Sequence, residues 1–192
     1  MKNNYDKILK ASIGLMDEFG YHGTSIKMIA EKSGITKSGV LHHFKSKEEI
    51  LATIVKMDVE AWTHHLLLIV KDDELSGHEK LKKFLRFQLN HWAKNKRSMN
   101  IFLRESRYLG NENRIVYNRS RRIYGHLVKE IIQQIKAENE SFGEDLDISV
   151  VTNGILGMCN WVSIWYSEEG KYSIDQIADQ FYKILEGRLF SS

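Results

Sequence analysis

Three residues near the N-terminus have the spacing of a helix-turn-helix. Ala30 is followed four residues later by Gly34 and six residues after that by Val40. A small residue lets two helices cross closely, a glycine accepts a positive φ in the turn, and an apolar residue fills the corner between the helices. Residues 21–47 carry five lysines against one glutamate, which suits a phosphate backbone. The pattern predicts binding to double-stranded DNA.

The residue types give little support for a metal site or a catalytic site. The pairs His42–His43 and His64–His65 are poor metal sites, because consecutive helical residues do not share a face. The single cysteine, Cys159, lies in an apolar segment, where burial would raise its pKa and make it inert. No glycine-rich phosphate loop or nucleophile elbow is visible. We therefore expect no enzyme, no catalytic residues, no metal and no cofactor.

The composition favours an all-α fold. The chain has 192 residues, of which 42% are hydrophobic and 28% charged, and it contains no proline to interrupt a helix. Helical periodicity predicts nine helices, of which the first ends at Gly20 and the fourth opens with a capping box of Ser46 and Glu49. The longest apolar run near the middle has only five residues, so we expect no membrane span and a cytoplasmic protein.

The later helices are expected over residues 79–93, 99–109, 115–138, 148–166 and 174–189. Breaks rich in glycine separate them, among them a Phe-Gly-Glu break that begins at Phe142. No strand is expected.

The N-terminal residues resemble the TetR family of bacterial transcriptional regulators. The resemblance rests on motifs that run through the first 50 or so residues: Ile8-Leu9-Lys10-Ala11, Gly20-Tyr21, Thr24-Ser25, Ile29-Ala30, Gly34, His43-Phe44 and Ser46-Lys47-Glu48-Glu49-Ile50-Leu51. It implies a three-helix DNA-binding head over residues 1–47 and a helical ligand-binding and dimerisation domain over residues 48–192.

The resemblance also implies which residues meet DNA. They lie at the start of the second helix, on the third helix and at the start of the fourth: Thr24, Ser25, Thr36, Lys37, Ser38, Gly39, Leu41, His42, His43 and Lys47. Thr24, Ser25 and Lys47 are expected to contact phosphates. Lys47 lies at the start of the expected fourth helix, where free amides and the positive end of the helix dipole favour an anion. Leu41 departs from the tyrosine usual in the family, so one backbone contact is missing or is replaced by contact with a thymine methyl.

The segment 148–166 is apolar nearly all round, which indicates a helix buried on two sides. Gly154 and Gly157 would allow another helix to approach closely. We expect the last two helices to form a homodimer, as the family usually does. The dimer would hold two recognition helices about 34 to 36 Å apart on a palindromic operator.

The stretch from Gly157 to Trp161, with Trp165-Tyr166, Gly170, Ser173-Ile174 and Ile177-Ala178, resembles the FadR-type branch of the family, which responds to fatty acyl-CoA. Residues 94–122 carry nine basic against two acidic side chains and could meet CoA phosphates or form surface ion pairs. The residues expected to contact such an effector are Phe87, Asn90, Arg104, Arg107, Tyr108, Tyr124, Met158, Trp161 and Trp165. Trp161 and Trp165 share a face and line either a pocket or the dimer interface.

The sequence thus predicts a ligand-responsive homodimeric repressor that an acyl-CoA or similar lipophile releases from its operator, with a role in fatty-acid metabolism. The alternatives are a repressor of an efflux gene that senses drugs or other lipophiles, and an architectural DNA binder without an effector.

Overall fold

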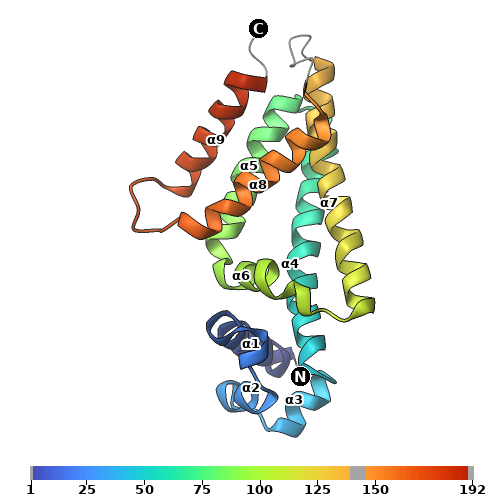
Figure 1. Ribbon diagram of the computed structural model, residues 1–192, viewed down its shortest axis with the longest axis vertical. Helices are drawn as coiled ribbons and strands as arrows, with labels where there is room; N and C mark the ends of the chain where they lie inside the picture. Colours follow the sequence, from blue (N-terminus) through green and yellow to red (C-terminus); the bar gives the residue numbers. More distant parts are fainter. Residues whose placement is uncertain (1, 139–145, 190–192) are drawn as a thin grey trace. The chain divides into compact units, whose positions relative to one another are not determined.

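The computed structural model describes residues 2–138 and 146–189, which form nine α-helices, one short 3-10 helix (η1) and no strand (Figure 1). The all-α prediction with nine helices is therefore confirmed. The elements in chain order are α1 (Lys2–Gly23), α2 (Ile26–Ser33), α3 (Lys37–His43), α4 (Lys47–Val70), α5 (Gly77–Lys94), α6 (Lys96–Glu105), η1 (Ser106–Tyr108), α7 (Asn111–Glu138), α8 (Ile148–Trp165) and α9 (Ile174–Leu189). The break expected at Phe142 lies outside the described residues.

Local signals place most of the helix ends. Gly20 has φ +71° and ψ 172°, so the helical path expected to stop there is broken within α1. The Ser46 hydroxyl accepts from the Glu49 N–H at 3.1 Å, as the capping pattern predicts. At α9, the Ser173 N–H donates to Gln176 Oε1, and the Gln176 N–H donates to Ser173 Oγ. The predicted caps of α4 and α9 are thus present.

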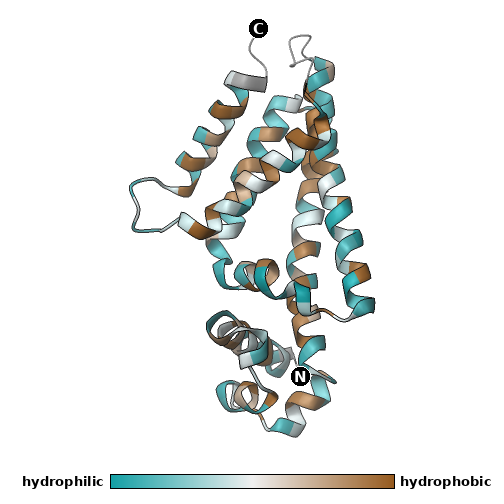
Figure 2. Cartoon of the chain, viewed as in Figure 1, coloured by the Kyte–Doolittle hydropathy of each residue, from teal (hydrophilic) through white to brown (hydrophobic). Residues whose placement is uncertain are grey.

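The chain divides into two compact units, and the division falls inside α4 and inside α7. Unit 1 comprises Met1–Glu60 and Lys96–Arg119, and unit 2 comprises Ala61–Asn95 and Ser120–Ser192. Each has its own buried apolar side chains. Those of unit 1 include Ile8, Met16, Ile29, Val40, Phe44, Ile50 and Met99, and those of unit 2 include Leu66, Leu81, Phe84, Leu89, Val128, Ile132, Cys159 and Val162. Figure 2 shows polar and apolar residues interspersed along α7, as in an amphipathic helix.

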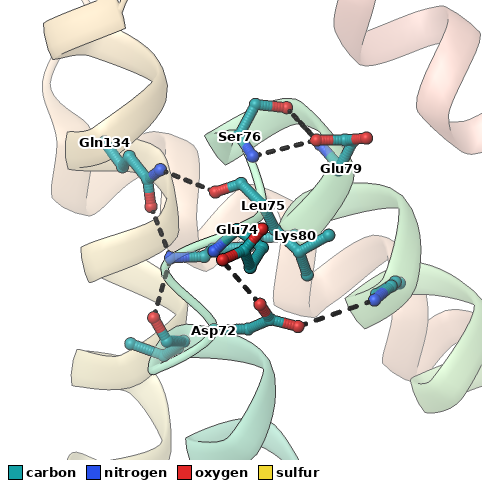
Figure 3. A network of polar contacts seen from close by, with 9 residues as sticks. Asp72, Glu74, Leu75, Ser76, Glu79, Lys80 and Gln134 are labelled. Atoms are coloured by element: carbon teal, nitrogen blue, oxygen red, sulfur yellow. Dashed lines mark hydrogen bonds and ion pairs between the residues drawn. The ribbon is translucent and has the colours of Figure 1, made fainter.

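A polar network organises the turn between α4 and α5 in unit 2 (Figure 3). The buried Lys80 ammonium donates to the Val70 carbonyl at 2.8 Å and to Gln134 Oε1 at 2.9 Å. The Gln134 amide in turn donates to the Leu75 carbonyl at 3.1 Å. A buried charge is tolerated only when its donors are satisfied, so this network joins α7 to the end of α4 and the start of α5.

Candidate functional site

Within unit 1, α2 and α3 form the turn that the sequence predicts. Gly34 has φ +68°, and its N–H closes α2 onto the carbonyls of Ala30 and Glu31. The Thr36 hydroxyl accepts from the Gly39 N–H at 3.1 Å and begins α3. Val40 is fully buried, as the residue in the corner between two helices should be. The helix-turn-helix geometry is present at the predicted positions.

One face of α3 is open to solvent and suits a DNA groove. Four exposed residues lie on the same side of this helix: Lys37, Ser38, Leu41 and His42. Thr36 and Ser25, which cap α3 and α2, are exposed as well. This face combines a cation, hydroxyls, an imidazole and an apolar side chain, which are groups that read phosphates, base edges and thymine methyls.

Gly39 and His43 are less accessible than the other predicted contacts on α3. A Cβ on Gly39 would lie 2.8 Å from Ile35 Cγ2, so the glycine allows α3 to pack closely against the turn. The His43 ring makes edge contacts with Tyr5 and His42, with centroids 6.4 Å and 5.6 Å apart. His43 therefore helps to join α1 to α3.

The placement of Thr24 does not fit the expected side-chain contact with a phosphate. Thr24 is 1% exposed, and its hydroxyl donates to the Gly20 carbonyl at 2.9 Å. A buried threonine and a phosphate-binding threonine both suit the residue before a helix N-cap, so the sequence does not distinguish them.

The Lys47 ammonium already has hydrogen-bond partners within the chain, unlike that of a lysine that is free to bind phosphate. The Lys47 ammonium donates to the carbonyls of Tyr21 and Thr24 at 2.6 Å each and lies 4.3 Å from the centre of the Tyr21 ring. Burial lowers the pKa of this ammonium from its ordinary value. These contacts assign Lys47 first to holding the α1–α2 turn against the start of α4.

One residue expected at the effector, Tyr108, contacts the end of α1. The Tyr108 ring stacks on Tyr21 at 5.5 Å between centroids, and the Arg107 guanidinium lies 4.9 Å from the Tyr108 ring centre. The buried Glu105 carboxylate accepts from the Tyr21 N–H at 3.1 Å. The α6–η1 segment is therefore joined to the DNA-binding head by stacking and a charge-assisted hydrogen bond.

A second carboxylate joins α4 to the start of α7. Glu48 Oε1 accepts from the Gly110 N–H at 3.1 Å and from Asn113 Nδ2 at 2.6 Å. Since Glu48 follows Lys47 directly, one turn of α4 contacts both the head and the start of α7. This arrangement within unit 1 provides a physical route by which a shift of α6 or α7 would move the recognition helix.

Asp58 is a buried carboxyl in unit 1 whose environment opposes its charge. Ser98 Oγ donates to Oδ1 at 3.3 Å, whereas Oδ2 has no hydrogen-bond partner among the described residues. Burial raises the pKa of Asp58 to about 6. The carboxyl of the folded protein therefore binds a proton more tightly than that of the unfolded chain.

This difference predicts a pH-dependent effect of Asp58→Asn. Because the folded pKa is the higher one, ionised Asp58 destabilises the fold above about pH 6, and the penalty disappears below about pH 4. Asparagine stays neutral, so the variant should gain roughly 2 kcal/mol near pH 7.5 and lose this advantage toward pH 4. Thermal unfolding of both proteins across this range is the measurement. An advantage that does not change with pH would contradict the assignment.

Unit 2 contains a cluster of aromatic side chains from α4, α5 and α7. The Trp62 ring lies 5.5 Å from His91, 6.3 Å from Trp92 and 6.1 Å from Tyr124, measured between ring centroids. The Tyr124 hydroxyl donates to Gln88 Oε1, and both residues are buried. Of these five residues only Tyr124 was expected at the effector, because tryptophans at helical spacing resemble an ordinary core.

The Cys159 thiol and the Tyr124 hydroxyl both stay protonated at neutral pH. Burial raises the pKa of the Cys159 thiol to about 12, as expected for an inert cysteine, and raises the pKa of Tyr124 well above its ordinary value. Desolvation lowers the pKa of His91, so its imidazole is neutral near pH 7. The described residues contain no group of three or more metal-ligating side chains.

Other predicted effector residues are distributed over unit 2. Phe87 stacks on His65 at 3.7 Å between ring centroids. Asn90 Nδ2 donates to Asp175 Oδ1 at 2.7 Å, which joins α5 to α9. Met158 is half-buried on α8, whereas Arg104 of unit 1 is exposed on α6. Phe87 and Met158 are thus partly accessible, and Asn90 already has a structural partner.

The last two helices carry an exposed apolar face. On α8, Trp161 is 64% and Trp165 48% exposed, beside the exposed Val150 and Ile164. A Cβ at Gly154 or Gly157 would meet nothing within 4 Å, so the space above both glycines is open. Ile184 on α9 is exposed as well. Neither tryptophan lies in the core of its own chain, so the face suits a partner better than a pocket within one chain.

The same apolar character makes α8 the one helix of the described chain that is long and apolar enough to cross a membrane. Length and composition are weak criteria, since a helix that packs on two sides also meets them. The Asp147 carboxylate caps α8 by accepting from the Val150 N–H at 2.9 Å, which is common at helices in water.

Two regions of the chain match known protein families. Residues 8–54 match the family described as "Bacterial regulatory proteins, tetR family", and residues 74–188 match "Tetracyclin repressor-like, C-terminal domain". The HTH-type transcriptional repressor KstR2 of Mycolicibacterium smegmatis is 25% identical over 188 residues, which cover 97% of this chain and 91% of KstR2.

Solved structures show the same fold. The crystal structure of AibR in complex with isovaleryl coenzyme A and operator DNA has a TM-score of 0.83 at 26% identity, with 94% of this chain and 97% of AibR covered. The fatty acid degradation regulator FadR from Bacillus halodurans has a TM-score of 0.79 at 22% identity, with 97% and 96% covered, and supports the fold alone. With its helix-turn-helix and both matched regions, the chain belongs to the TetR family of bacterial transcriptional regulators.

Proposed function

We propose that the protein is a cytoplasmic homodimeric repressor that binds a palindromic operator and is released from it by an acyl-CoA. In this proposal residues 1–47 contact DNA, and residues 48–192 dimerise and bind the effector. The observation that carries the DNA part is the exposed face of α3 next to a well-formed turn. The effector class is supported by the likeness to AibR, which was solved with isovaleryl coenzyme A and operator DNA.

The dimer is proposed from the exposed apolar face of α8 and α9. Trp161, Trp165, Ile164 and Ile184 would leave water on contact with the same face of a second copy. Gly154 and Gly157 would let the two α8 helices approach closely. A two-fold axis through this face would present two α3 helices to successive major grooves.

The response to effector is proposed to reach DNA through unit 1. Tyr108 and Glu105 contact Tyr21 at the end of α1, while Glu48 joins α4 to α7. An effector that prefers one arrangement of the helices it contacts would shift the population toward a dimer whose α3 spacing no longer fits the operator.

Thermal shift tests the effector class directly. We expect isovaleryl-CoA or palmitoyl-CoA to raise the melting temperature and to reduce binding of the protein to its operator, because a ligand that binds only the native state stabilises it. Coenzyme A alone and the cationic dye rhodamine 6G are the matched probes. Stabilisation by the dye alone would favour drug sensing, and stabilisation by none would favour an architectural DNA binder. Either result would contradict the acyl-CoA proposal.

A further inference from the structure

The aromatic cluster of unit 2 surrounds Trp62 with rings that present polar atoms. His91 meets Trp62 edge-on, and Trp92 stacks beside it with 28° between the ring planes. Trp62 and Trp92 are 4% and 3% exposed. Consecutive residues of α5 thus place an imidazole and an indole against one ring of α4.

Two of these polar atoms are buried without a hydrogen-bond partner among the described residues. They are Trp92 Nε1 and His91 Nε2. Leaving a buried donor unsatisfied costs about 1 to 3 kcal/mol, so most such groups in proteins have a partner. An imidazole nitrogen donates or accepts according to its tautomer, but an indole N–H can only donate. An acceptor atom from outside the chain would satisfy the Trp92 indole N–H.

The charge of that acceptor can also be inferred. A buried carboxylate needs a cation or several strong donors to offset its desolvation. Trp92 and Trp62 carry no charge, and desolvation lowers the pKa of His91, which keeps its imidazole neutral. Neutral donors among aromatic rings suit a neutral carbonyl oxygen, with apolar carbon packed on the rings.

We propose that Trp92 donates a hydrogen bond from its indole Nε1 to a neutral carbonyl oxygen of the effector, and that this contact distinguishes a thioester from a free fatty acid. His91, on the adjacent position of α5, provides the second polar contact. The inference rests on the proposed function and specifies it: the carbonyl bound by Trp92 is that of the acyl thioester. Trp92 and His91 are binding residues that the spacing of the sequence alone did not reveal.

The test compares ligands that differ only in the carbonyl. Titration calorimetry would measure the dissociation constant of the full-length dimer for whichever of isovaleryl-CoA and palmitoyl-CoA stabilises it, for the matching S-alkyl-CoA thioether and for the free acid. We expect the thioether, which lacks the oxygen, to bind roughly tenfold more weakly, and the acid more weakly still. Trp92→Phe, which keeps a ring but removes the N–H, should bind the thioester and the thioether about equally.

The outcomes separate this inference from the proposal on which it rests. If neither thioester binds, the acyl-CoA proposal fails. If a thioester binds but the wild-type protein does not prefer it over the thioether, the acyl-CoA proposal stands and the role of Trp92 is refuted. The same follows if Trp92→Phe keeps the full preference. Should that variant not fold, the ligand comparison on the wild-type protein decides by itself.

Discussion

Trp161→Asp is expected to convert the protein to monomers and to abolish tight operator binding. Trp161 is 64% exposed in a single chain and lies on the open side of α8 with Gly154 and Gly157. Burying a tryptophan at an interface removes about 150 to 250 Å² from water, which corresponds to roughly 4 to 6 kcal/mol. In a two-fold dimer each copy loses this contact and gains a buried carboxylate. The dimer dissociation constant should rise by at least about a thousandfold.

Analytical ultracentrifugation would measure the dissociation constant, and a gel shift with a full palindrome and with a half-site would measure DNA binding. The monomer should bind both DNAs about equally, because only a dimer gains from the second half-site. Leu68→Asp is the matched control, since Leu68 is an exposed leucine of α4 outside this face. A Trp161→Asp protein that stays dimeric would exclude the α8 face as the interface. A monomer that Leu68→Asp also produces would indicate a general loss of folding.

Short-range signals made much of the fold predictable. Gly20, Gly34 and the capping residues Ser46 and Ser173 act on atoms within four residues of themselves, so their spacing in the sequence is the relevant geometry. Amphipathic periodicity located the helices between them, and the sequence contains no proline that would break one. The helix-turn-helix is of the same kind, since Ala30, Gly34 and Val40 meet across a single turn.

Long-range contacts could not be predicted, and they decide the roles of several candidate residues. Glu105 bonds the Tyr21 N–H across 84 positions of the chain. Lys47 finds the carbonyl of Tyr21 across 26 positions. Whether a lysine faces an anion or its own chain depends on such partners, so the contacts of Lys47 with the Tyr21 and Thr24 carbonyls could not be predicted from its residue type.

The tryptophans illustrate the same limit from two directions. Trp161 looked equally suited to a pocket or an interface, and only its exposure in the folded chain favours the interface. Trp92 looked like core, and only its Nε1 atom, which has no hydrogen-bond partner among the described residues, distinguishes it from an ordinary core residue. Composition and spacing describe how apolar a residue is. The proposed functions depend instead on side chains that remain exposed in the folded chain, and on single buried atoms without a hydrogen-bond partner.

Lys37→Ala and Lys47→Ala are expected to weaken operator binding for different reasons. Lys37 is exposed at the start of α3, so its removal should weaken binding by about tenfold or more, while the melting temperature stays within about 1 °C of the wild type. Loss of one positive charge from the side of α3 that faces DNA would also make the salt dependence of binding shallower by about one ion. Gel shifts at several salt concentrations and thermal unfolding measure the two effects.

Lys47→Ala should instead lower stability first. Its ammonium makes two 2.6 Å hydrogen bonds to backbone carbonyls, and their loss leaves the carbonyls of Tyr21 and Thr24 without this donor. We expect a cost of about 2 kcal/mol, or roughly 4 to 8 °C in melting temperature. Lys71→Ala, at an exposed lysine, is the control for a lost surface charge. If Lys47→Ala melts like the wild type but shows the shallower salt dependence expected for Lys37→Ala, then Lys47 acts as the phosphate ligand that the sequence predicts, and its carbonyl contacts contribute little to the fold.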